Sequence, residues 1–223
     1  MKNFLVTAFF AAAASTASAQ VEIGLKLSPS ITSLRTEAPS GRGFRTENSK
    51  LTIGGGLLVD YFFGQNYAFS TGLLLVGKGG TFSYFDPATN RREEQKLGLQ
   101  YLQLPVSIKL FTNDITTDTK LYFQVGGSLN AAIAARINGS KFYRDPGRNG
   151  EESKALNHVI KPDAAVLAGL GIERQLGQST KVLAGVSYHR GLVNIERYFD
   201  KQRNFQDISL KNSEVALDLG IKF

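Results

Sequence analysis

The C-terminal stretch Val215-Ala216-Leu217-Asp218-Leu219-Gly220-Ile221-Lys222-Phe223 carries an apolar residue at every odd position. Its even positions hold alanine, aspartate, glycine and lysine. Successive side chains of a β-strand point to opposite faces, so this stretch predicts a strand with one face in apolar surroundings and one polar face. It therefore indicates a β fold.

The same period of two recurs in seven other segments. It is clear in Leu102–Leu110, where leucine, valine and isoleucine alternate with glutamine, proline, serine and lysine. The other six segments are Val21–Leu27, Leu51–Phe62, Tyr67–Phe85, Leu121–Ala131, Asp163–Arg174 and Val182–Tyr188. Within Tyr67–Phe85, the run Leu73-Leu74-Leu75-Val76 leaves the facing of the strand ambiguous. The segments approach the roughly 9–11 residues that a tilted strand needs to cross a bilayer.

The connections between these segments alternate in length. The short ones cover residues 63–66, 111–119 and 175–180, and the mostly longer ones cover 35–50, 86–96, 136–161 and 190–211. Short periplasmic turns and long external loops are typical of outer-membrane barrels. The predicted fold class is therefore all-β, an eight-stranded antiparallel up-and-down transmembrane β-barrel with both termini at the periplasmic side.

The composition excludes several kinds of site. The 223 residues include no cysteine, which excludes disulfide scaffolds, thiol catalysis, iron–sulfur clusters and cysteine-bound zinc. Two histidines leave little for a histidine-rich metal site. The 15 phenylalanines and 8 tyrosines favour β structure over a helical bundle. We predict no metal and no cofactor.

Residues 1–20 have the features of a secretory signal peptide. Lys2 supplies a positive charge, an apolar run extends from Phe4 to Ala14, and Ala17-Ser18-Ala19 offers small residues for cleavage. The run is too short to span a bilayer as a helix. The alternative is a buried N-terminal helix. We predict a cleaved signal peptide over residues 1–19 and one barrel domain over residues 20–223.

A soluble lipocalin-like barrel is the alternative to a membrane barrel, with apolar side chains inside and polar ones outside. The polar face of this chain consists mainly of glycine and small polar residues, which suits a narrow lumen better than a solvated surface. The terminal Phe223, preceded by Ile221 and Leu219, resembles the signal that directs barrels into the outer membrane. We predict a protein of the cell outer membrane that contacts the barrel-assembly machinery during insertion.

Several stretches resemble the PorT-like outer-membrane β-barrel family of Gram-negative bacteria. The most characteristic is Tyr101-Leu102-Gln103-Leu104-Pro105-Val106-Ser107-Ile108-Lys109. The others are Val21–Lys26, Gly72–Leu75 followed by Lys78-Gly79-Gly80, and Leu219–Phe223. The resemblance covers nearly all of residues 21–223 and implies an outer-membrane location. Most members of that family have no assigned function, and a few take part in protein secretion, so it implies little about activity.

The alternation assigns nine charged residues to the inward face. Those expected near the periplasmic end are Glu22, Asp60, Lys109, Lys120, Glu173 and Lys222, and those expected deeper are Lys26, Glu214 and Asp218. An eight-stranded barrel has room for little besides side chains, so we expect these charges to pair and plug the lumen. Closure of the barrel should bring Lys26 and Asp218 together. The alternative is an ion or proton path.

No catalytic residue is predicted. The motifs Gly-x-Ser-x-Gly and His-Glu-x-x-His are absent from the sequence. His189 is expected to face the lumen near its external end, and His158 lies in the third long connection. Hydrolase chemistry would require either histidine to pair with a serine and an acidic residue. Pro105, which cannot donate a ladder hydrogen bond, predicts a bulge or bend.

The four longer connections hold the basic excess of the chain, with 18 basic and 11 acidic residues. The simplest explanation is contact with outer-membrane lipid and lipopolysaccharide, and the alternative is docking of an acidic partner; nucleic acid is not expected there. The predicted function is a structural or interaction role, through these loops or the periplasmic rim, with membership of a secretion apparatus implied by the resemblance. The alternative is a narrow conduit for small or apolar solutes. We do not predict an enzyme.

Overall fold

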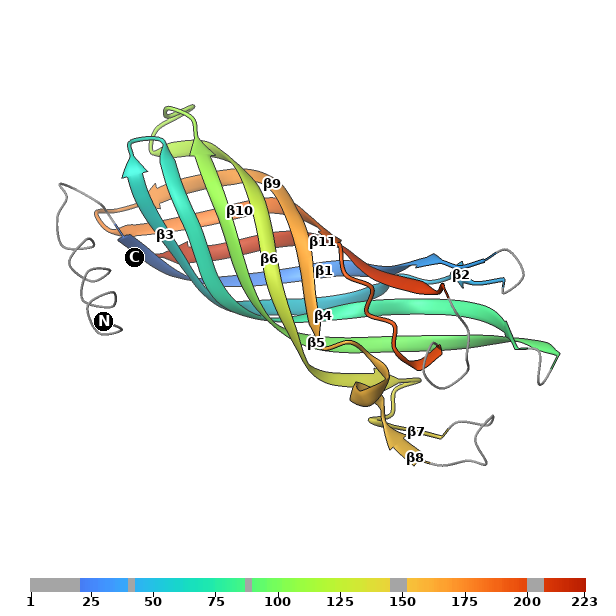
Figure 1. Ribbon diagram of the computed structural model, residues 1–223. Coiled ribbons are helices and arrows are strands. Elements are labelled where there is room, and N and C mark those ends of the chain that lie inside the picture. Colours follow the sequence, from blue (N-terminus) through green and yellow to red (C-terminus); the bar gives the residue numbers. More distant parts are fainter. Residues whose placement is uncertain (1–20, 40–42, 87–89, 145–151, 200–206) are drawn as a thin grey trace, which may run out of the picture.

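Eight long strands, each antiparallel to its neighbours, dominate the structure (Figure 1). The computed structural model describes residues 21–39, 43–86, 90–144, 152–199 and 207–223, so the predicted signal peptide lies outside the described residues. The long strands are β1 (Val21–Glu37), β3 (Lys50–Gly64), β4 (Tyr67–Asp86), β5 (Arg91–Phe111), β6 (Thr119–Ile137), β9 (Pro162–Leu176), β10 (Thr180–Gly191) and β11 (Ser209–Lys222). The short elements are β2 (Arg45–Thr46), β7 (Phe142–Arg144), β8 (Glu152–Lys154) and the 3₁₀ helix η2 (Ala155–His158). Within the described ranges, no helix is long and apolar enough to cross a membrane.

The long strands pair in chain order and close into a ring. Each is hydrogen-bonded to the next, and β11 returns to β1, where Lys26 lies opposite Gly220. Beside this seam the Phe223 amide donates a hydrogen bond of 2.9 Å to the Ile23 carbonyl. The predicted eight-stranded antiparallel up-and-down barrel is confirmed.

The two ends of the barrel differ in their connections. At the end where β1 begins and β11 ends, which we call the turn end, β3–β4, β5–β6 and β9–β10 are joined by short segments (Figure 1). The opposite end, which we call the loop end, carries the β1–β3, β4–β5, β6–β9 and β10–β11 connections. Three of these four connections are long, as expected.

The expectation of a connection over residues 86–96 is wrong, because most of these residues belong to strands. β4 and β5 continue as a hairpin that projects at the loop end, with Asp86 opposite Arg91 and Thr81 opposite Lys96 (Figure 1). The charged residues that suggested a loop are tolerated in these strands because this part of the hairpin extends past the apolar segments. Opposite charges that face each other across strands, as Asp86 and Arg91 do, favour the pairing.

The outer wall of the ring is apolar. Leu102, Leu104, Val106, Ile108 and Leu110 of β5 all point outwards with 39–45% of their surface exposed, and the other long strands present similar residues. We call this band of exposed apolar side chains the apolar belt. Near the turn end it includes the aromatic residues Tyr61, Phe63, Tyr67, Phe69, Phe123 and Phe223. An apolar exterior with an aromatic girdle is typical of a membrane barrel and opposite to a soluble lipocalin-like one.

The ambiguous run in β4 keeps the period of two. Leu73 and Leu75 are exposed on the outer wall, whereas Leu74 and Val76 are buried. The run reads as continuously apolar because the lumen at this level is itself apolar: Leu74 and Val76 pack in one cluster with Tyr101. Both faces of the strand therefore meet apolar surroundings here.

The expected bulge at Pro105 does not occur, although the pairing of β5 with β4 is interrupted at Leu104 and Pro105. Pro105 lies opposite Ser128, and its strand keeps one register with β4 from Gln103 to Val106. The Pro105 carbonyl accepts a hydrogen bond of 2.9 Å from the Thr71 hydroxyl. The register shift of β5 against β6 lies instead at Gln100/Tyr101. The missing N–H thus interrupts the ladder with β4 without shifting its register.

Candidate functional site

Three carboxylates surround one ammonium group inside the turn end. Lys222 Nζ lies 2.7 Å from Glu22 Oε2, 2.9 Å from Asp60 Oδ2 and 2.5 Å from Glu173 Oε2. The side chains of Lys222 and Asp60 have no exposed surface. These four residues come from β11, β1, β3 and β9, so the ammonium group links strands from around the ring.

Two further lysines complete this group. Lys109 Nζ of β5 lies 2.8 Å from Asp60 Oδ2, and Lys181 Nζ of β10 lies 2.5 Å from Glu22 Oε1 and 3.7 Å from Glu173 Oε1. We call the six residues the turn-end charge cluster: Glu22, Asp60, Lys109, Glu173, Lys181 and Lys222. With three acids and three bases, the cluster is neutral. Buried ions require such partners because their desolvation is costly.

The three carboxylates of the turn-end charge cluster are close enough together to suggest a metal site, because one oxygen from each lies within 4.8 Å of the others. The ammonium group of Lys222 already lies against all three. A metal ion at their centre would have to displace it. The donor set therefore fits a lysine better than a metal ion.

Lys120 occupies a different environment from the other predicted inward charges. It is half-buried opposite Glu173 on β9 and lines an opening of about 190 Å³ at the turn end together with Asp118, Glu173 and Lys181. Lys120 therefore lies at the rim of the lumen, beside the turn-end charge cluster.

A second charged level lies deeper in the lumen. Lys26 Nζ is 3.0 Å from Asp218 Oδ1, and the Ser28 hydroxyl donates a hydrogen bond of 2.8 Å to the same oxygen. Glu214 lies 3.7 Å from Lys78 Nζ. The sequence reasoning did not single out Lys78, because the ambiguous facing of β4 hid it, nor Lys181, although it shares the inward parity of Leu183.

Glycines make room for an aromatic ring between these charged residues. Tyr122 of β6 lies across Gly171 of β9 and Gly185 of β10, so that a β-carbon on either glycine would collide with its ring or hydroxyl. The Lys109 ammonium group sits 5.3 Å from the centre of the same ring. The tyrosine ring and the charged side chains thus pack together inside the turn-end half of the lumen.

At the loop end, two connections extend the ring above the ends of β9 and β10. The Ala132 amide of β6 donates a hydrogen bond to the Lys161 carbonyl, and the Ile160 amide donates one to the Ile195 carbonyl. The Ile195 amide in turn bonds the Leu210 carbonyl of β11 at 2.8 Å. The β6–β9 and β10–β11 connections are therefore joined to the sheet.

Asn194 fixes this arrangement with its side chain. Its Oδ1 accepts hydrogen bonds from the amides of Leu210 at 2.8 Å and Glu196 at 3.0 Å. Its Nδ2 donates to the Ile208 carbonyl at 2.8 Å. One amide side chain thus connects both limbs of the β10–β11 connection.

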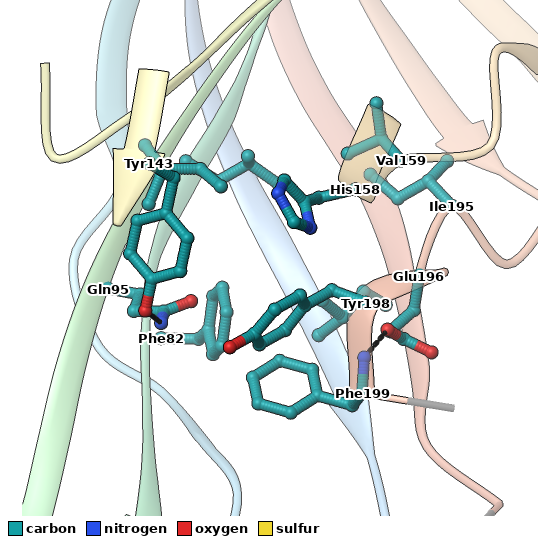
Figure 2. Close-up of a pocket in the computed structure, with 12 residues that line it drawn as sticks. Phe82, Gln95, Tyr143, His158, Val159, Ile195, Glu196, Tyr198 and Phe199 are labelled. Atoms are coloured by element: carbon teal, nitrogen blue, oxygen red, sulfur yellow. Dashed lines mark hydrogen bonds between the residues drawn. The ribbon is translucent and has the colours of Figure 1, made fainter. Parts of the chain in front are cut away.

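Five aromatic rings pack together above the lumen. We call Phe44, Phe82, Tyr84, Tyr198 and Phe199 the loop-end aromatic cluster. Phe199 is its centre, with ring centroids at 5.1 Å from Phe44 and Tyr198, 6.0 Å from Phe82 and 4.8 Å from Tyr84. Its amide bonds the Glu196 carboxylate, and Figure 2 shows Phe82, Tyr198 and Phe199 facing one another.

A small cavity lies within the loop-end aromatic cluster. It is bounded by Phe82, Tyr198, Phe199 and nearby side chains and measures about 30 Å³ (Figure 2). The described loop residues therefore pack as an apolar core at the external end of the lumen.

The two histidines lie in different parts of the barrel. His158 Nε2 lies 2.6 Å from the Ser153 hydroxyl, and its ring packs edge-on against Tyr143 and Tyr198 beside the loop-end aromatic cluster. His189 is buried in the lumen, where Nε2 lies 3.4 Å from the Ser187 hydroxyl. The structure thus brings each histidine next to a serine.

The residues of the predicted insertion signal line the outer wall beside the β1–β11 seam. Phe223 and Leu219 are exposed there, and Ile221 is half-buried. All three belong to the apolar belt or its turn-end border.

The comparisons with known proteins agree with this geometry. The sequence profile of the outer membrane protein beta-barrel domain family matches residues 12–197. No curated protein matches the chain. Neisserial surface protein A superposes with a TM-score of 0.50 at 12% identity, covering 92% of this chain and 98% of the other. Outer membrane protein OprG from Pseudomonas aeruginosa superposes with a TM-score of 0.52 at 10% identity, covering 92% and 97%. The chain therefore belongs to the outer membrane protein beta-barrel domain family, and the protein is located in the outer membrane.

Proposed function

We propose that this protein is a structural or interaction protein whose barrel is a closed anchor for ordered external loops. One observation carries the proposal: buried ions lie inside the turn end of the lumen, and packed aromatic rings lie at its loop end. The turn-end charge cluster supports closure at one end, and the loop-end aromatic cluster supports it at the other. A filled lumen gives solutes no path, so binding would take place at the surface.

The described parts of the loops support an interaction role by their hydrogen bonds and their charge. Asn194 and the ring extension hold the β10–β11 connection against β11. Basic side chains such as Lys154 and Lys161 remain exposed on the loop end. A rigid, basic surface binds with less loss of conformational entropy than a mobile one. The short turn-end connections, around Lys120, are the second surface on which a partner could dock.

We also propose, from the sequence, that the protein belongs to the PorT-like family and takes part in a secretion apparatus. The support for it is the stretch Tyr101–Lys109 and the order of motifs along the chain. Lipopolysaccharide at the loop end, the barrel-assembly machinery and an unidentified protein remain the proposed partners. We propose no enzymatic role, because the motifs Gly-x-Ser-x-Gly and His-Glu-x-x-His are absent from the sequence.

Two measurements test the proposal. In a planar bilayer, the purified full-length protein should show no large, stable conductance, whereas a conduit would conduct or admit solute into liposomes. Crosslinking in native membranes should then recover a partner attached to external loops or the turn-end rim. Sustained conductance together with solute uptake would favour the alternative, a narrow conduit for small or apolar solutes.

A further inference from the structure

A basic groove lies on the outer wall of the barrel, at the loop-end border of the apolar belt. Its volume is about 330 Å³, and its cationic lining consists of Lys50, Arg136 and Lys141. We call it the basic groove. Its floor includes Gly77 of β4 and Gly98 of β5. No acidic side chain is among the described residues that line it.

The shape of the basic groove follows from the glycines in its floor. Neighbouring residues of β4 and β5, such as Val76 and Leu99, point into the lumen, so Gly77 and Gly98 face outwards. Neither glycine has a side chain to fill the outer wall. The Lys50 ammonium group extends over Gly98, 2.6 Å from the position that a β-carbon of Gly98 would take. The Lys50 side chain thus reaches from β3 across β4 to β5. Its charge lies near Arg136 of β6, because Gly98 is opposite Arg136.

The charges of the basic groove are of one sign. Lys96 and Arg136 both lie close enough to Lys50 to repel its ammonium group. Like charges held together are unfavourable unless an opposite charge joins them. An anion with several acceptor oxygens would offset this repulsion and form charge-assisted hydrogen bonds with lysine and arginine.

The position of the basic groove identifies the source of the anion. Apart from Gln100, which also lines the groove, the nearest outward side chains towards the turn end are apolar, with Ile53, Leu75, Leu102 and Ile133 exposed by 63, 43, 41 and 49%. The groove therefore lies at the level where acyl chains end and headgroups begin, on the external side of an outer-membrane barrel. Basic pockets at this level suit lipid headgroup phosphates.

We propose that the basic groove binds a phosphate group of a lipopolysaccharide molecule in the outer leaflet. This inference deepens the lipopolysaccharide contact proposed above. It does not depend on a closed lumen, because the groove lies on the outer wall.

Two variants test the charge and the shape of the groove separately. The first, Lys50→Gln/Arg136→Gln/Lys141→Gln, removes the charges. The second, Gly98→Val, keeps them and fills the floor; the side chain that it meets first is the flexible end of Lys50, which can move aside. The matched control, Arg91→Gln/Arg190→Gln/Arg197→Gln, removes three exposed charges elsewhere on the loop end. Heat-modified gel mobility confirms that each variant is folded.

Native mass spectrometry of the detergent-solubilised full chain measures retention of phosphorylated lipid A, of its dephosphorylated form and of phosphatidylcholine. The wild type and the control should retain phosphorylated lipid A, and the triple variant should bind it at least about tenfold more weakly, as loss of charge-assisted hydrogen bonds predicts. Gly98→Val should also lose retention. The dephosphorylated lipid and phosphatidylcholine should not be retained.

Three outcomes would overturn the proposal. Equal losses in the triple variant and the control would indicate diffuse attraction to the basic loops. Normal binding by Gly98→Val would show that the groove is not the site. Displacement of lipid A by inorganic phosphate at equal concentration would identify a site for free phosphate. None of these results bears on conductance, so failure here leaves the closed-anchor proposal standing.

Discussion

The turn end and the loop end of the barrel both bury side chains, but of opposite chemistry. At the turn end, Lys222 and its carboxylates are buried as a neutral set of ions. At the loop end, Phe199 and four other rings form an apolar core. The ions belong to residues of the barrel strands, whereas three of the five aromatic residues belong to connections. The difference indicates that the stability of the barrel should depend on the buried charges. The order of the loops should depend on the aromatic rings.

The largest expected effect comes from Lys222→Met. This change leaves three buried carboxylates without their shared cation, and breaking a buried ion pair costs roughly 3–5 kcal/mol. The free energy of unfolding, measured by urea titration in lipid vesicles, should fall by about that amount. Lys161→Met, at an exposed position, is the control. Equal stability of the two variants would mean that the carboxylates do not depend on Lys222.

The next effect concerns the loop end alone. Phe199→Ala removes the central ring of the loop-end aromatic cluster, and large-to-small changes of buried phenylalanine cost about 3 kcal/mol or more. Because barrel hydrogen bonds are untouched, the loss should be local: proteolysis of the external loops should accelerate at least tenfold, since about 1.4 kcal/mol is a tenfold change. The midpoint of barrel unfolding in urea should stay unchanged.

The control for Phe199→Ala is Phe142→Ala, because Phe142 lies at the same end but is exposed. Its cleavage rate should remain that of the wild type. A lower unfolding midpoint of the barrel in Phe199→Ala would show that the two ends are coupled. Barrel stability and loop order would then not depend on separate sets of side chains.

A smaller effect is expected at the second charged level. Asp218→Asn should lower the unfolding midpoint more than Lys26→Met combined with Asp218→Asn, because the single change leaves a lysine unpaired in the lumen. The cost should be about 2 kcal/mol, below the fully desolvated range, because 12% of the Lys26 side chain is exposed. Urea titration of both variants measures it. An equal or smaller loss in the single variant would leave these charges free to serve a solvated path.

The smallest effect is predicted for Asn194→Ala. It removes three hydrogen bonds from a half-buried side chain, where water can replace part of them, so we expect a local cost of about 1 kcal/mol. Hydrogen exchange at the amides of Glu196 and Leu210 should accelerate, while exchange within β5 should not. Asn157→Ala, at an exposed position, should change neither. Unchanged exchange in Asn194→Ala would indicate that the rings alone order this connection.

The period of two accounts for what sequence reasoning could predict. Because a strand alternates its faces, parity alone separates outward residues such as Leu104 from inward ones such as Lys109. It fails where both faces are apolar, and for that reason Lys78 was missed. The prediction of a connection over residues 86–96 was wrong, because charged residues outside the membrane can form a strand as readily as a loop. Pro105 does interrupt the ladder with β4, but the bulge expected there is absent because the register does not shift.

The basic groove and the loop-end aromatic cluster share one reason for being hidden in the sequence. Phe44, Tyr84 and Phe199 lie in three separate segments, and Lys50 meets Gly98 only because β3, β4 and β5 are neighbours. No local spacing encodes such contacts. They depend on strand order, register and the path of the connections.

The sequence by itself determined the strand number, the direction of the side chains and the outer-membrane character, because each depends on the period of two along a single strand. Tertiary structure alone decided which charges meet and what closes the loop end. The physical reason is distance along the chain: Lys222 and Asp60 are separated by 162 positions but lie 2.9 Å apart. Only closure of the ring, which places β1 between β11 and β3, brings them together.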